Sequence, residues 1–184
     1  MPDHHEVETI PLPDLTRADA VALYRLAHIV WENAPDPEAK ADALLAAAGG
    51  PSAPGQLHLV RGSGGIIAKA HSFGREIATP RGRLRVMALA GVCSAPDHRG
   101  EGLGKAVAQA ALARVDGGEF PLSLFQTGVP DFYRKLGARC VGNRFVDSQA
   151  DDPQANPWWN DYVMIYPAEA DWPEGEIDLL GPAW

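Results

Sequence analysis

The stretch that decides the fold lies at residues 97–105 and reads DHRGEGLGK. It follows an apolar run from Val86 to Val92 and opens an alanine-rich run from Leu103 to Val115. This order predicts a strand, a glycine turn and a helix start. Glycines let the backbone approach a ligand closely, and the first turn of a helix offers N–H donors and the positive end of the helix dipole. The stretch therefore predicts a cradle for an anion such as a pyrophosphate.

Three glycine-loop patterns compete for this stretch. The phosphate loop of nucleoside triphosphatases needs G-x-x-x-x-G-K-[ST], but Ala106 follows Gly104-Lys105, and Arg99 stands where the first glycine should be. The dinucleotide fingerprint G-x-G-x-x-G fits poorly, because the glycines here alternate as G-x-G-x-G. The pattern [RQ]-x-x-G-x-[GA] is met in full by Arg99, Gly102 and Gly104.

This last pattern is the acyl-CoA signature of the GNAT acetyltransferases, and the chain resembles that family. A second segment, DFYRKLGA at residues 131–138, is similar to the family's F-Y-x-K-L-G segment, a short helix that enters the next strand. The distance between the two motifs suits one helix and one strand. The resemblance implies an N-acetyltransferase with acetyl-CoA as cosubstrate and no metal. An ordinary β–α turn followed by a surface helix is the structural alternative.

Composition limits the remaining classes of function. A length of 184 residues fits one domain over 1–184 with a real core, and a net charge of −8 makes a nucleic-acid partner unexpected. No run is apolar enough for a membrane span, and the polar, acidic N-terminus is unlike a signal peptide. Cys93 and Cys140 form neither a metal motif nor a disulfide framework, so we expect buried thiols in a cytoplasmic protein. Whether the protein is a homodimer stays open.

Periodicity and turn residues predict an alternating order of strands and helices. Thr16 followed by Asp19 resembles a capping box at the start of the first helix. Glycine and proline place hairpin turns at 62–64 and 80–82 and a loop at 147–157. The expected strands are 6–12, 56–61, 65–77, 84–94, 120–126, 138–146, 162–166 and 176–180, and the expected helices are 17–31, 38–48, 103–115 and 130–136.

The predicted fold is therefore α/β (α+β), with a mixed, mostly antiparallel central sheet flanked by helices. By resemblance, the sheet is splayed in a V that takes the pantetheine arm of acetyl-CoA by strand addition. The resemblance assigns the strand edge to Val92, Cys93 and Ser94. It assigns the pyrophosphate cradle to Arg99, Gly100, Glu101, Gly102, Leu103 and Gly104. Positive charge in or beside the two motifs comes from Arg99, Lys105, Arg134, Lys135 and Arg139.

The chemistry of acetyl transfer also needs a proton donor, a base and an acceptor site. Tyr133, inside the second motif, is the expected general acid, because a phenol can protonate a thiolate of similar basicity. The alternative is a packed core tyrosine. His71 is a candidate base, Glu32 is a candidate contact for a cationic amine, and deprotonation through water remains an alternative. Trp31 and Trp184 are candidate acceptor contacts, together with Trp158 and Trp159, although most tryptophans are simply packing.

Most of the chain also resembles one branch of the family, the aminoglycoside 2′-N-acetyltransferases. The similar segments include Gly65 to Ala68, the hairpin around Arg81-Gly82 and a carboxy-terminal tryptophan. The chain departs from that branch at Ala90, where the branch carries a glutamate, and at Ala183, where it carries an acidic residue. We therefore expect transfer to a primary amine of a small molecule. Aminoglycosides, peptide or protein amines and acyl-CoA binding without turnover are the alternatives.

Overall fold

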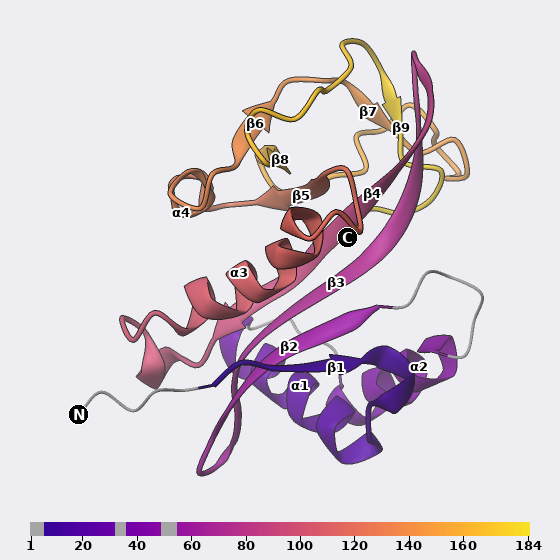
Figure 1. Cartoon of the computed structure of the whole chain (residues 1–184). Helices are drawn as coiled ribbons and strands as arrows, with labels where there is room; N and C mark the ends of the chain where they lie inside the picture. Colours follow the sequence, from indigo (N-terminus) through magenta and orange to yellow (C-terminus); the bar gives the residue numbers. More distant parts are fainter. Residues whose placement is uncertain (1–5, 32–35, 49–54) are drawn as a thin grey trace. The chain divides into compact units, whose positions relative to one another are not determined.

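The computed structural model describes residues 6–31, 36–48 and 55–184 (Figure 1). The chain divides into two compact units. The first unit comprises Met1–Phe73 with Ala90–Ala111, and the second comprises Gly74–Leu89 with Leu112–Trp184. Each unit is therefore built from two separate stretches of chain. The long strands β3 (Gly65–Thr79) and β4 (Gly82–Ser94) and helix α3 (Leu103–Asp116) run from one unit into the other.

The first unit packs two helices against antiparallel strands in the order β1-β2-β3-β4. Leu57 and Leu59 of β2 share a hydrophobic cluster with Leu23 and Leu26 of the first helix. Because β2 pairs with β3 in the register Leu57↔His71 and Leu59↔Lys69, Lys69 and His71 lie on the strand face that the first helix covers. Besides parts of β3, β4 and α3, the first unit contains β1 (Glu8–Pro11), a 3₁₀ turn (Leu12–Asp14), α1 (Arg17–Val30), α2 (Pro37–Ala48) and β2 (Gln56–Gly62).

The second unit carries strands in the order β4-β5-β8-β6, with a short pair, β7 and β9, beside the end of β3. β4 pairs with β5 in parallel through Met87↔Ser123 and Ala88↔Leu124. Its core contains Ile77, Val86, Leu122 and Leu124. Its elements are β5 (Ser123–Thr127), α4 (Pro130–Arg134), β6 (Arg139–Val141), β7 (Phe145–Val146), β8 (Tyr162–Tyr166) and β9 (Ile177–Asp178).

The predicted fold class is confirmed as a mixed α/β fold with a mostly antiparallel sheet flanked by helices. The cap at Thr16 is also confirmed, since its Oγ1 accepts from the Asp19 backbone N–H at 3.1 Å. The prediction of one strand over 138–146 is wrong, because residues 142–144 are not part of a strand and separate β6 from β7. The prediction of two buried thiols holds for Cys93 only. Cys140 is half-buried on β6, which pairs on one side only, with β8.

Candidate functional site

The glycine loop lies between β4 and α3 in the first unit, with its glycines open to solvent. Gly100 and Gly102 have φ of +88° and +79°, a backbone conformation that glycine adopts without strain. A Cβ built at Gly100, Gly102 or Gly104 meets no heavy atom of the described residues within 4 Å beyond the adjoining backbone of its own chain segment. The first intrahelical bond of α3 runs from Ala106 N–H to the Gly102 carbonyl at 3.0 Å. The N–H groups just before it are therefore available to a ligand, and the loop fits a pyrophosphate.

The charged side chains of the loop are arranged unevenly. Arg99 and Lys105 are exposed, so both guanidinium and ammonium groups are accessible to an anion. Glu101 lies at 3.2 Å from His98, and both side chains line a cavity of about 810 Å³. The other lining residues come from α1, the β2–β3 turn and the end of β4: Leu26, Ile29, Gly62, Ser63, Gly64, Ile66, Ile67, Ala95 and Asp97. The side chain of Glu101 thus faces this cavity, whose size suits a small molecule.

The end of β4 carries the predicted cofactor edge. Gly91 has φ of +60° and is exposed, and this left-handed residue turns the strand just before Val92. Cys93 is buried, and burial raises the pKa of its thiol. Ser94 is half-buried. Gly91 was not among the predicted site residues, although a glycine inside a strand pattern is a recognisable signal of such an irregularity.

Two of the predicted acceptor residues, Trp31 and His71, lie near a lysine that sequence reasoning missed. Lys69 on β3 places its Nζ 5.7 Å from the ring centre of Trp31 and 5.9 Å from that of Tyr24. His71 lies two residues further along the same face, with its ring 4.7 Å from that of Phe73. Glu32 lies outside the described residues. The structure thus brings Trp31 to Lys69 and places His71 next along that strand face.

Tyr133 lies on α4 in the second unit. Its side chain is buried, with ring centres 4.6 Å from Phe125 of β5 and 4.9 Å from Phe132. Next to Tyr133, Arg134 pairs with Asp131 at 2.6 Å. Arg139 donates to the carbonyls of Ala168 and Ala170. Tyr133 thus belongs to an aromatic cluster with Phe125 and Phe132.

Trp184 is packed onto β5 of the same unit. Its Nε1 donates to the Leu124 carbonyl at 2.9 Å, and the Gln126 amide donates to its carbonyl oxygen at 2.9 Å. Its ring packs edge-on against Trp158 at 4.9 Å, and the Arg75 guanidinium lies 4.8 Å from its ring centre. Trp158 is buried and Trp159 is 70% exposed. Of these tryptophans, Trp159 therefore presents the larger free surface.

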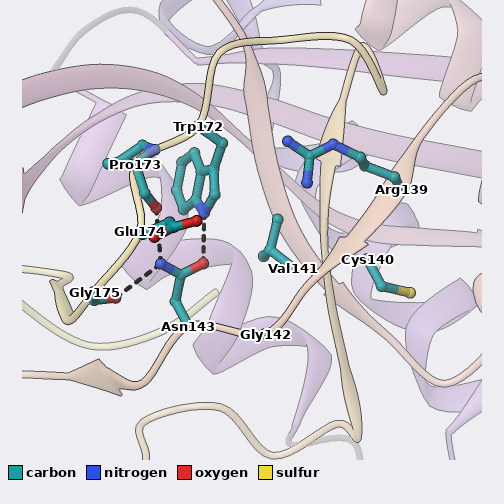
Figure 2. A pocket seen from close by; sticks show the side chains of 9 residues that line it. All are labelled: Arg139, Cys140, Val141, Gly142, Asn143, Trp172, Pro173, Glu174 and Gly175. Atoms are coloured by element: carbon teal, nitrogen blue, oxygen red, sulfur yellow. Dashed lines mark hydrogen bonds between the residues drawn. The ribbon is translucent and has the colours of Figure 1, made fainter.

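A further hollow of about 420 Å³ lies along β6 in the second unit (Figure 2). Asn143 connects three points of the 172–175 segment: it accepts from Trp172 Nε1 at 2.6 Å and donates to the carbonyls of Pro173 and Gly175. Figure 2 shows Trp172 and Arg139 on opposite sides of Val141. The Asn143 amide thus binds groups of the protein itself, so its role here is structural. Asn143 lies between the end of β6 and the start of β7.

Within residues 6–31, 36–48 and 55–184, no cluster of three or more His, Cys, Asp or Glu side chains is arranged to hold a metal ion. In the same part of the chain, no helix has the length and apolar character needed to cross a membrane.

Comparisons with known proteins agree with this geometry. A search of curated proteins finds no match. Among solved structures, the chain is similar to a GNAT family N-acetyltransferase (YhbS) from Escherichia coli in complex with CoA. The identity is 12% and the TM-score 0.64, over 100% of this chain and 98% of that one.

Two other solved structures are similar at 19% identity. One is an acetyltransferase from Trypanosoma brucei, with a TM-score of 0.58 over 74% of this chain and 95% of that one. The other is a GCN5-related N-acetyltransferase from Kribbella flavida, with a TM-score of 0.59 over 75% of this chain. This chain spans only 34% of the Kribbella chain. At these identities the likeness shows the fold. The model of the acetyltransferase (GNAT) domain matches residues 14–141, and the chain therefore belongs to the GNAT acetyltransferase family.

Proposed function

We propose that this protein transfers an acetyl group from acetyl-CoA directly to a primary amine of a small molecule. The observation that carries the proposal is the open glycine loop at the start of α3, where Gly100 and Gly102 hold positive φ and nothing described occupies the space above them. Backbone N–H groups at a helix start bind phosphate. Arg99 and Lys105, both exposed, add positive charge beside the loop.

The residues of β4 would hold the thioester end. Bound acetyl-CoA supplies an activated acetyl group. The backbone of Val92, Cys93 and Ser94 would pair with its pantetheine arm, and a backbone N–H near Val92 would polarise the thioester carbonyl. The left-handed Gly91 supports this role, because it redirects the peptide that follows. Holding amine and thioester together supplies much of the rate by proximity.

Tyr133 is the proposed general acid for the departing thiolate. Its position in the second motif supports this role, and its burial against Phe125 would keep the phenol fixed. General acid catalysis contributes about 10²–10⁴-fold. Tyr133→Phe keeps the ring and removes only the hydroxyl, so this variant tests the acid role without changing the packing.

The proposed acceptor is a less densely charged amine than an aminoglycoside. A site for several ammonium groups needs carboxylates that face them. Ala90 and Ala183 supply none at the two positions where the aminoglycoside branch carries acids. Trp31 is 43% exposed and offers apolar contact area, which suits an amine with an apolar body.

A two-part experiment tests the proposal. Calorimetry measures acetyl-CoA binding, and a library of amines is then screened for release of free thiol. We expect binding together with turnover on at least one small primary amine. Binding with no turnover on small amines or peptides would identify a non-catalytic acyl-CoA module. Turnover on peptide amines alone would overturn the proposed acceptor class, and absence of binding would overturn the whole proposal.

A further inference from the structure

Lys69 occupies an unusual place in the middle of β3. Its side chain is half-buried on the face that α1 covers, opposite Leu59 of β2. The ammonium group stands within cation–π range of both Tyr24 and Trp31. No carboxylate of the described residues forms an ion pair with it, although six exposed arginines of the chain have acidic partners: Arg17, Arg25, Arg61, Arg81, Arg83 and Arg134.

The amine of Lys69 reaches the irregular point of β4. Apart from Gly91 itself and its two chain neighbours, Lys69 Nζ is the only heavy atom of the described residues within 4 Å of a Cβ built on Gly91, at 3.2 Å. The Lys69 amine therefore lies directly against the backbone of β4 at Gly91. Val92, whose N–H is proposed to polarise the thioester carbonyl, is the next residue. The Lys69 amine is thus directed at the strand position where the proposed reaction takes place.

The surroundings of Lys69 favour its neutral form. Burial lowers the pKa of the ammonium group, and the nearby Cys93 thiol opposes this shift. The titratable groups around it are the Tyr24 phenol on α1, the Cys93 thiol on β4 and His71 two residues along β3. Burial also raises the pKa of the Tyr24 phenol and of the Cys93 thiol. The burial that lowers the pKa of Lys69 thus also keeps its two neighbours, Tyr24 and Cys93, in their neutral forms up to a higher pH.

We propose that Lys69 is the general base that takes the proton from the acceptor's ammonium group, an assignment that rests on the proposed function. The acceptor N–H bond breaks and a proton joins Lys69 Nζ. The freed lone pair forms the C–N bond to the thioester carbonyl, and the C–S bond breaks. After the C–N bond has formed, the nitrogen loses a second proton, and the departing thiolate takes up one proton. Lys69 then returns the proton that it took to solvent. The products are an amide and a free thiol.

The main test is a pH profile of kcat/KM for three variants with the best amine from the library. Lys69→Met should lower kcat/KM about 10²–10⁴-fold near neutral pH and remove the acidic limb of the profile. Lys69→Arg should not restore activity, because a guanidinium stays protonated. Lys40→Met, which removes an exposed lysine of α2, is the matched control and should leave the profile unchanged.

Two further measurements separate a base from a merely structural residue. Trimethylamine, a tertiary amine that forms no stable amide, should raise the rate of Lys69→Ala in proportion to its concentration. In the unmodified protein, trace labelling with acetic anhydride across pH should show Lys69 becoming reactive at lower pH than Lys40. This labelling needs neither turnover nor a variant that folds.

The outcomes distinguish the two proposals. An unmodified enzyme without turnover on any amine refutes the proposed function, and the labelling still reports on Lys69. An active enzyme whose Lys69→Met variant keeps the acidic limb, or whose Lys69→Arg variant is fully active, overturns the role of Lys69. Labelling of Lys69 at the same pH as Lys40, or at a higher one, overturns it as well.

Discussion

Replacing Gly102 tests the anion cradle most directly. Gly102 has φ of +79° and open space above it, so a side chain there meets no clash and costs only left-handed backbone strain, about 1–2 kcal/mol. That strain is the same for Gly102→Glu and Gly102→Gln, which differ in charge alone. The comparison therefore separates the effect of charge on binding from the effect of strain on folding.

The expected loss of affinity follows from Coulomb's law. A carboxylate about 4 Å from one phosphate charge is repelled by about 1 kcal/mol in water and about 4 kcal/mol at an effective dielectric constant of about 20. We expect Gly102→Glu to bind CoA at least about tenfold more weakly than Gly102→Gln, a difference of about 1.4 kcal/mol. Isothermal calorimetry gives both affinities, and thermal unfolding should show the same small loss of Tm in the two variants. Equal affinities in folded proteins would refute the cradle.

Three other expectations follow. Tyr133→Phe should lower kcat about 10²–10⁴-fold with CoA affinity nearly unchanged, and full turnover would return Tyr133 to a packing role. Aminoglycosides with a free 2′-amine should give kcat/KM below about 10⁴ M⁻¹s⁻¹, and a higher value would show that the missing carboxylates matter little. Tyr166 donates to Asp116 at 2.6 Å, and this bond raises the pKa of the phenol to about 12. Since the folded pKa lies above the ordinary value of about 10, the bond's contribution to stability is present below pH 10 and is lost as pH rises towards 12. Denaturant unfolding measured across this pH range should show a smaller decrease in the free energy of unfolding for Tyr166→Phe than for the unmodified protein.

Local signals in the sequence predicted much of the fold. Thr16 and Asp19 lie three residues apart, and at the start of α1 the Thr16 hydroxyl accepts from the Asp19 backbone N–H and donates to the Asp19 carboxylate. The strand Tyr162–Tyr166 has the predicted bounds. The break at Asn143 was not predictable in the same way, because its partners Trp172, Pro173 and Gly175 are about thirty residues away in sequence. Only the folded chain brings them together.

The site shows the same division. The glycine loop is contiguous in sequence, and its pattern could be recognised from Arg99, Gly102 and Gly104 alone. Lys69 gave no such signal, since a lone lysine in a strand pattern reads as a solvent-facing residue. Its setting depends on Tyr24 and Trp31, which come from α1 and the residue after it. The sheet register and helix packing that create this setting are properties of the tertiary structure.

The interleaving of the two units limits how the protein can be divided. The first unit needs residues up to Ala111, so a fragment 1–111 also carries 74–89, the hairpin that belongs to the second unit. In that fragment Ile77 and Val86 would lose their buried partners Leu122 and Leu124 and would expose an apolar strand surface prone to self-association. Neither unit is a continuous piece of chain. A single proteolytic cut or stop codon therefore cannot release either of them intact and free of the other's residues.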